Sequence, residues 1–318
     1  MIDLPPSELV SRLYYNIRLI RRVEETIADI YPSDKIKSPV HLSIGQESVA
    51  AGVCAALDDE DVVSGTYRGH ATYLAKGGDL PGMMAELFGK VGGCARGKAG
   101  SMHLVGMEQN ILGTSAVVGT TIPIALGYAL ALKREGKGRV VALFFGDGAT
   151  EEGVFSESLN FASLHKLPAL FVLENNQLAI HSPKRNRQIA DNICERVETY
   201  RIPAHRIENG DTIEIYERSM AGIQKLRAGD GPVFLECMTY RWREHVGPAE
   251  DYDAGYRNRE DLLPWQENDQ MDLLGAKVDP KDRAEMNAEV EDRIQDAVAF
   301  AEASDFPELE ELHNHVFA

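Results

Sequence analysis

Two side chains with oxygen ligands follow short apolar segments of the chain. Asp147 follows the run RVVALFF in the motif GDG, and Asn176 follows the run ALFVL in the motif ENN. Carboxylate and amide oxygens suit hard cations such as Mg²⁺ or Ca²⁺, which also bind diphosphates. The N–H groups of Gly148 and Ala149, at the start of the helix expected after GDG, would bind the same anion. We therefore predict a site for a cation and a diphosphate.

Each of these motifs, taken alone, also has a simpler structural explanation. An aspartate in a turn often caps a helix, and an Asn-Asn pair often forms a turn. A dinucleotide site at GDG is disfavoured because Glu151 occupies the position of the third glycine. The segment from Gly92 to Lys98 almost spells a P-loop, but Ala99 stands where Ser or Thr should bind Mg²⁺. A nucleoside triphosphatase is therefore disfavoured too.

The elements that would position Asp147 and Asn176 alternate between strand and helix. Apolar runs at 139–145, 169–173 and 232–242 predict strands, and the segment between the first two predicts a helix. This order indicates a doubly wound α/β fold with a parallel sheet, helices on both faces and right-handed crossovers. Ligands of such sheets bind at the carboxyl ends of the strands, so the two side chains should lie side by side.

The remaining segments predict helical extensions and irregular loops. Apolar spacing predicts helices at 7–30 and 44–57, and the acidic tail at about 265–318 is also expected to be helical. The stretch 64–119 is dense in glycine, which is typical either of backbone that approaches a ligand or of surface loops. With no Ser/Pro-rich linker, we expect a single domain over 1–318, with its core at about 40–245.

Composition excludes several classes of protein. The 318 residues carry a formal net charge of −17, which disfavours nucleic acid and anionic membranes as partners. No membrane span is expected, because the uncharged stretch between Glu108 and Lys133 is interrupted by Gly, Thr and Pro. No signal peptide is visible, and the four cysteines have neither disulfide-framework nor zinc spacing. These features predict a cytoplasmic protein.

The motif GDGATEEGVFSESLNFASLHKLPALFVLENN has the form of the thiamine diphosphate motif. Other segments agree with it: HLSIGQE (41–47), TYRGH (66–70), GKAGSMH (97–103), VVGTTIPIALG (117–127) and TYRWREH (239–245). Over nearly its whole length the chain resembles the alpha subunit of the decarboxylating, or dehydrogenase, component of 2-oxoacid and acetoin dehydrogenase complexes. The resemblance implies the thiamine diphosphate-binding fold, with thiamine diphosphate and Mg²⁺ as cofactors.

The resemblance also implies roles for individual residues. Asp147 and Asn176 would bind Mg²⁺ through their side chains, and Leu178 through its backbone carbonyl. His245 and His41 would be catalytic, beside the reactive carbon of the cofactor. We expect the pKa of His245 to lie near working pH, and His70 and His103 are weaker candidates. The other matching positions would bind the cofactor: Tyr67, Arg68, Gly148 and Ala149 at the diphosphate, Ala116 and Val118 at the aminopyrimidine.

The implied activity needs partners. A beta subunit should complete an α2β2 assembly and supply the glutamate that activates the cofactor. The enzyme would decarboxylate a 2-oxo acid (pyruvate or a branched-chain acid) or cleave acetoin, and pass the acyl group to a lipoyl domain of an acyltransferase core.

The segment after His245 departs from the family pattern. It reads VGPAEDYDAGYR, and Val246 replaces a serine that is phosphorylated in mitochondrial relatives. We therefore expect no phosphoregulation at this position. The departure motivates one alternative, a two-subunit carboligase that transfers an acyl unit to a ketone without a lipoyl partner. Another alternative is a non-catalytic scaffold subunit.

Overall fold

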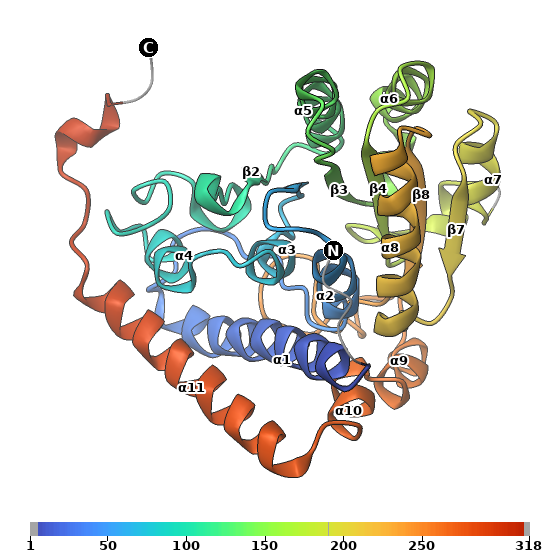
Figure 1. Cartoon of the computed structure of the whole chain (residues 1–318). Coiled ribbons are helices and arrows are strands. Elements are labelled where there is room, and N and C mark those ends of the chain that lie inside the picture. The colour runs from blue at the N-terminus through green and yellow to red at the C-terminus, as the bar shows by residue number, and fades with distance from the viewer. Residues whose placement is uncertain (1–5, 190, 315–318) are drawn as a thin grey trace.

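A computed structural model gives the fold of the chain and describes residues 6–189 and 191–314. At its centre is a six-stranded parallel sheet in the order β2-β1-β3-β4-β8-β7, with helices on both faces (Figure 1). The predicted doubly wound α/β fold is confirmed. The strands of the sheet are β1 (Val62–Ser64), β2 (Ile111–Gly113), β3 (Val141–Gly146), β4 (Ala169–Asn175), β7 (Ala204–Ile207) and β8 (Val233–Met238); β5 (Leu178–Ala179) and β6 (Ser182–Pro183) form a separate antiparallel hairpin.

The central strands are buried on both faces, which explains their unbroken apolar runs. Along β3, Val141, Leu143 and Phe145 belong to the hydrophobic cluster on one side of the sheet. Ala142 and Phe144 belong to the cluster on the other side. Because successive side chains of a strand point to opposite faces, one short strand contributes to both halves of the core.

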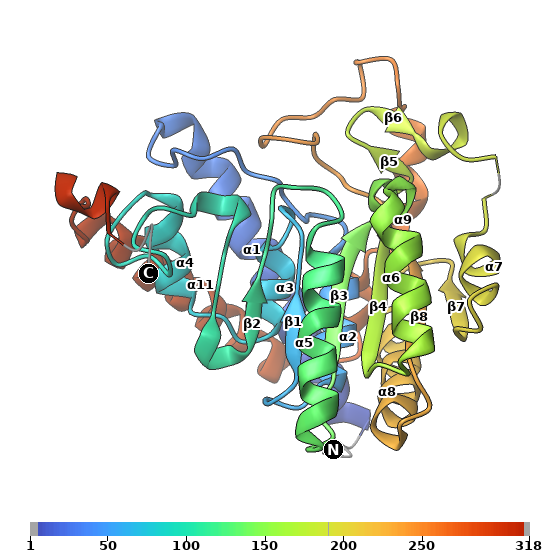
Figure 2. The same cartoon turned by 90° about the horizontal axis from the view of Figure 1, so that it is seen from above.

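Helices α5 and α6 pack on one face of the sheet, and α2 and α8 pack on the other. An outer layer of α1, α4, α10 and α11 covers the second face, and α11 lies alongside α1 (Figures 1 and 2). The helices are α1 (Pro6–Ile30), α2 (Glu47–Ala56), α3 (His70–Ala75), α4 (Leu80–Leu87), α5 (Thr121–Glu135), α6 (Gly153–Leu164), α7 (Ile193–Glu198), α8 (Thr212–Ala228), α9 (Leu263–Glu267), α10 (Gln270–Gly275) and α11 (Pro280–Ala303).

The extensions at both ends are helical, as the apolar spacing predicts. The first helix covers almost the predicted range and begins at Pro6, where a proline without an N–H is tolerated in the first turn. The acidic tail forms α9, α10, α11 and a short 3-10 turn at Leu309–Leu312. The last four residues of the predicted tail, 315–318, lie outside the described residues.

The glycine-rich loop at 92–100 surrounds a side chain of the protein itself. Backbone N–H groups of Ala95, Gly97, Ala99 and Gly100 donate to the carboxylate of Glu86 at 2.7 to 3.0 Å. These N–H groups therefore already have a partner within the chain. A convergent set of N–H groups binds an anion, and here the anion is a buried glutamate.

Within the described ranges, no helix is both long enough and apolar enough to cross a bilayer. All four cysteines are free thiols, so no disulfide joins them.

Candidate active site

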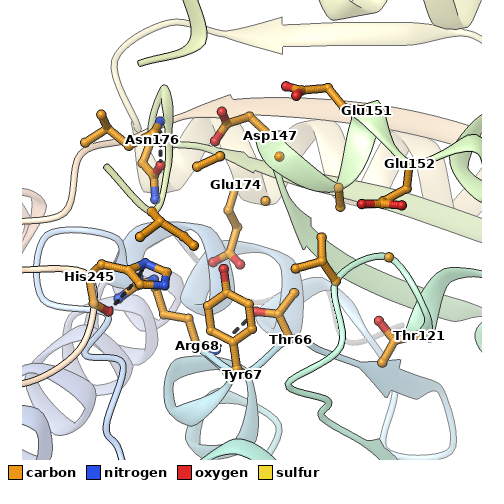
Figure 3. Close-up of a pocket in the computed structure, with 18 of the residues that line it drawn as sticks. Thr66, Tyr67, Arg68, Thr121, Asp147, Glu151, Glu152, Glu174, Asn176 and His245 are labelled. Atoms are coloured by element: carbon orange, nitrogen blue, oxygen red, sulfur yellow. Dashed lines mark hydrogen bonds between the residues drawn. The ribbon is translucent and has the colours of Figure 1, made fainter. Parts of the chain in front are cut away.

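A cavity of about 290 Å³ opens at the carboxyl ends of β3 and β4. These strands pair with Gly146 opposite Glu174, so the residues that follow each strand lie close together. Asp147 and Asn176 line one side of the cavity, and the segment carrying Tyr67 lines the other (Figure 3). The convergence predicted from the order of strands is thus present.

Three predicted metal ligands occupy the same wall of the cavity. Asp147 is 1% exposed, and Asn176 is held by a hydrogen bond from its Nδ2 to Oε1 of Gln46 at 2.9 Å. That bond fixes the orientation of the amide, whose Oδ1 accepts from the N–H of Leu178 at 3.0 Å. Leu178 lies opposite Pro183 in the hairpin, and proline has no N–H to donate to the Leu178 carbonyl. One carboxylate, one amide oxygen and one such carbonyl form a donor set that fits Mg²⁺.

The segment that follows β3 differs from the prediction. The helix expected directly after GDG begins only at Gly153, and a 3-10 turn at Asp147–Glu151 comes first. Gly148 and Ala149 therefore lie in the first turn of this 3-10 helix and not at the N-terminus of α6, which is what the sequence predicts. The first N–H groups of a 3-10 turn also lack intrahelical acceptors. Both residues line the cavity, so they stay candidates for binding an anion.

Tyr67 and Arg68 lie on the side of the cavity opposite Asp147 (Figure 3). The guanidinium of Arg68 donates to the carbonyl of Leu42 at 2.6 Å and to that of His245 at 3.3 Å. Burial lowers the pKa of Arg68 to about 10, so the group stays charged at neutral pH. The cavity thus has one permanent cation on this wall.

Two histidines and a tyrosine form an aromatic cluster beside the cavity. The ring centroid of His41 lies 4.5 Å from that of Tyr67 and 5.0 Å from that of His245. His245 lines the cavity, and its Nδ1 lies 3.4 Å from Nη2 of Arg68. His41 lies behind it, and its buried Nδ1 has no hydrogen-bond partner among the described residues. The structure therefore brings the two predicted catalytic histidines together, with only His245 at the cavity.

Both rings are neutral near physiological pH. Burial, reinforced by the positive charge of Arg68, lowers the pKa of His245 to about 3 and that of His41 to about 3. The expectation that the pKa of His245 lies near working pH is therefore wrong for the chain alone. A neutral imidazole can still accept a proton at one nitrogen and donate at the other.

The predicted aminopyrimidine segment borders the cavity only in part. Val118 lines it, together with Ser115, Val117 and Gly119, whereas Ala116 between them does not. Val117 and Val118 are exposed apolar side chains at the rim.

Three polar residues at or beside the cavity were missed by the sequence analysis. Glu174 is buried at the end of β4, and burial raises its pKa to about 7 against the opposing charge of Arg68. Gln46 orients Asn176, and Arg187 forms an ion pair with Asp147. Glu174 and Gln46 stand inside quoted motifs, ENN and HLSIGQE, which was a usable signal. No sequence signal indicated Arg187, because its contact with Asp147 depends on the tertiary fold.

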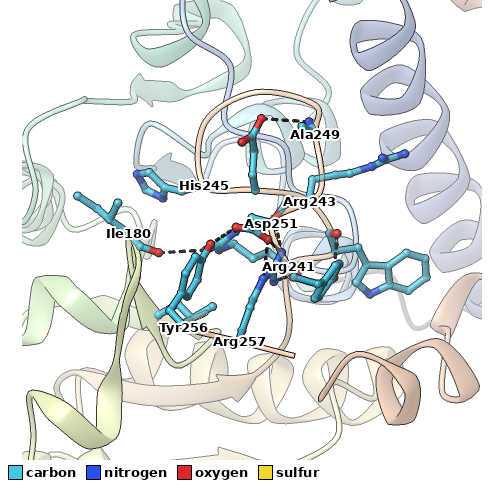
Figure 4. Close-up of polar contacts among 12 residues, drawn as sticks. Ile180, Arg241, Arg243, His245, Ala249, Asp251, Tyr256 and Arg257 are labelled. Carbon is cyan, nitrogen blue, oxygen red and sulfur yellow. Dashed lines mark hydrogen bonds and ion pairs between the residues drawn. The ribbon is translucent and has the colours of Figure 1, made fainter. Parts of the chain in front are cut away.

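The segment that carries His245 is fastened by a buried ionic cluster (Figure 4). The carboxylate of Asp251 accepts from Arg241 at 3.0 Å, from Arg257 at 2.7 Å and from the hydroxyl of Tyr256. Arg241 also donates to the carbonyl of Ile180 at 3.0 Å. One cluster therefore joins the segment after β8 to the β5–β6 hairpin, which contains Leu178.

The weaker histidine candidates lie away from the cavity. His70 is completely buried, with its Nδ1 3.1 Å from Glu24 and its Nε2 2.7 Å from Ser101. Glu24 also accepts the N–H of Ser43 at 3.0 Å, so this contact joins the segments that carry His41 and Arg68. His103 is exposed and does not line the cavity.

Comparisons with known proteins agree with this geometry. Residues 15–310 match the family model described as the dehydrogenase E1 component. The chain is 36% identical to the alpha subunit of acetoin:2,6-dichlorophenolindophenol oxidoreductase from Bacillus subtilis, over 96% of this chain and 92% of that protein. It is 36% identical to the pyruvate dehydrogenase E1 component subunit alpha of Porphyra purpurea, with the same coverage. The corresponding subunit of Zymomonas mobilis is 34% identical, over 99% and 92% of the two chains.

Proposed function

This chain belongs to the dehydrogenase E1 component family, and from that premise we propose how its site works. It is the alpha subunit of a thiamine diphosphate-dependent oxidoreductase of the 2-oxoacid dehydrogenase type. Its substrate is a 2-oxo acid or acetoin. The observation that carries the assignment of the site is the convergence of Asp147, Asn176 and Leu178 on one wall of the cavity.

Thiamine diphosphate bound in this cavity would supply an electron sink for breaking the bond next to the substrate carbonyl. Asp147, Asn176 and the carbonyl of Leu178 would hold Mg²⁺, which binds the diphosphate. Arg68 adds a permanent cation from the opposite wall, and the N–H groups of Gly148 and Ala149 add donors beside Asp147.

His245 is placed to handle protons at the substrate. Its Nδ1 faces the guanidinium of Arg68 at 3.4 Å, which favours an unprotonated Nδ1 and a proton on Nε2. With its pKa held low by burial, the neutral ring donates through Nε2 without carrying a charge that would repel Arg68. His41 packs edge-on against this ring and positions it.

The alpha subunit works with a beta subunit, as the subunit names of its relatives imply. We propose an α2β2 assembly in which the beta subunit completes the cofactor site, and a lipoyl acyltransferase core as acceptor. The support for this acceptor is the similarity to pyruvate dehydrogenase subunits over nearly the whole chain.

The test uses the chain assembled with its beta subunit, thiamine diphosphate and Mg²⁺. Pyruvate, branched-chain 2-oxo acids and acetoin are each supplied with dichlorophenolindophenol, which takes up the two electrons released when the aldehyde-level fragment is oxidised to an acid. We expect reduction with one substrate class and loss of it in Asp147→Asn. Absence of both turnover and calorimetric cofactor binding would overturn the proposal.

The same preparation separates the acceptor hypotheses. Addition of a lipoyl domain should give an acylated lipoyl group if a dehydrogenase complex is the correct assembly. Formation of a new C–C bond with a ketone, and no acylated lipoyl group, would instead establish the carboligase alternative.

A further inference from the structure

The predicted metal ligand Asp147 already has a cationic partner within the chain. Nη2 of Arg187 contacts its Oδ2, and Nη1 of the same guanidinium contacts Oε1 of Glu151. Gln188, the next residue, donates to Oγ1 of Thr150 at 3.0 Å and to Glu151 at 2.9 Å. The segment after β6 therefore lies directly against the turn that carries Asp147.

Independent contacts hold this segment in place, so the ion pair is not a loose surface contact. The ammonium of Lys184 is buried, bonded to the backbone carbonyl of Asp191 and 3.9 Å from the buried carboxylate of Glu236. Nε of Arg187 donates to the carbonyl of Ser182 at 3.0 Å. Only 10% of the Arg187 side chain is exposed. The guanidinium is thus directed at Asp147 by an anchored backbone.

The positive charge of Arg187 stabilises the buried carboxylate of Asp147 and also opposes binding of a metal cation to it. A carboxylate that is 1% exposed is costly to ionise without a cation beside it. Mg²⁺ needs carboxylate oxygen at about 2.0–2.1 Å and demands near-ideal octahedral geometry. A guanidinium on one oxygen of the same carboxylate is a like charge next to that metal. The two cations therefore compete.

We propose that Arg187 is the counter-ion that Asp147 exchanges for the metal, so that its release sets the affinity of the metal site. The inference rests on the proposed function in one respect, that Asp147 binds the metal. Glu151, whose side chain is 34% exposed, still contacts the guanidinium after the exchange. Loading of the site is then coupled to movement of the Arg187 guanidinium away from Asp147, while the anchored backbone stays in place.

The experiment measures binding of Mn²⁺ alone, by electron paramagnetic resonance, to the chain assembled with its beta subunit. Without diphosphate, Arg187 has no phosphate to bind, so its effect on the metal is isolated. We expect Arg187→Gln to bind Mn²⁺ at least about fivefold more tightly than the wild type, because a competing cation is gone. Arg187→Lys keeps the positive charge but lacks the planar guanidinium that contacts two carboxylates at once. Its Mn²⁺ affinity should therefore lie between those of the wild type and Arg187→Gln.

The matched control is Arg185→Gln, an exposed arginine of the same segment, which should leave Mn²⁺ affinity unchanged. Equal or weaker Mn²⁺ binding by Arg187→Gln overturns the exchange. Failure of the proposed metal site looks different: Asp147→Asn would then bind Mn²⁺ as the wild type does.

Thermal unfolding gives a second readout that does not depend on turnover. Without metal, Arg187→Gln should unfold at a lower temperature than the wild type, since Asp147 loses its partner. With saturating Mn²⁺ the difference should shrink, because the metal replaces that partner. A difference of the same size under both conditions would mean that Arg187 acts only as a structural contact.

Discussion

Replacement of Asp251 by asparagine tests whether the ionic cluster holds the segment that carries His245. Asn keeps the shape of the side chain and removes its charge. Arg241 and Arg257, whose side chains are 1% and 2% exposed, would then be two buried cations without a carboxylate between them. Removing one partner of a buried ion pair costs about 3–5 kcal/mol. One amide oxygen still accepts hydrogen bonds, so we expect about 3 kcal/mol.

The loss should be concentrated in the segment between β8 and the 3-10 turn at Arg259–Asp261. Limited proteolysis should cleave this segment faster in Asp251→Asn, and urea unfolding should give the change in free energy. Because His245 lies at the start of the segment, kcat should fall more than cofactor affinity. The matched control is Asp253→Asn, an exposed aspartate two residues away, which should behave as the wild type.

Two results would refute this reasoning. Stability of Asp251→Asn within about 0.5 kcal/mol of the wild type would mean that the backbone carbonyls bonded to the two arginines satisfy them. A drop in stability without faster proteolysis between 243 and 257 would mean that the cluster supports the whole fold instead of this segment.

The remaining predictions concern four histidines and one buried glutamate. His41 and His245, with pKa values lowered to about 3, should show no ring-proton titration by NMR between about pH 5 and 8, and a midpoint near 6.5 would contradict their burial. In the unfolded chain both rings take up a proton below about pH 6.5, whereas in the folded chain they stay neutral down to about pH 3. The free energy of unfolding should therefore fall as the pH is lowered from about 6.5 towards 3. Glu86→Gln should lower the free energy of unfolding by about 2–4 kcal/mol, because an NH₂ group would face the N–H donors of the loop. Urea unfolding measures this change, and an unchanged midpoint would contradict the prediction. In His70→Asn the shorter side chain cannot contact both Glu24 and Ser101, so the free energy of unfolding should fall by about 1–3 kcal/mol in the same assay. His103→Asn, at an exposed position, should leave it unchanged.

The central part of the fold was predictable because buried parallel strands leave a strong local signal. The runs at β3 and β4 are continuous and apolar, and the run at β8 is interrupted by Glu236 alone. The helix between the first two fixes their order. The strands of the central sheet that no pattern indicated, β1, β2 and β7, are three or four residues long. Segments that short contain too few residues to show a period.

Much of the site was predictable for a different reason. Asp147 and Asn176 each come within three residues of the end of a predicted strand, and the topology of parallel sheets then brings them together. Partners from distant segments were not predictable: Arg187 is 40 residues from Asp147 along the chain. The protonation state of His245 was also missed, because burial and the charge of Arg68 are properties of the folded chain.

The carboxylate inside the glycine-rich loop has a consequence for how this protein can vary. Four N–H groups of the loop converge on Glu86, and each belongs to the backbone, so side chains such as those of Ala95 and Ala99 can change without breaking a bond. Chain length cannot change in the same way, since one inserted or deleted residue would move every later N–H away from its oxygen. The stretch should therefore tolerate exchange at Ala95 and Ala99 and resist insertions and deletions. Gly97 and Gly100 are exceptions, because their positive φ angles and close neighbours disfavour a side chain.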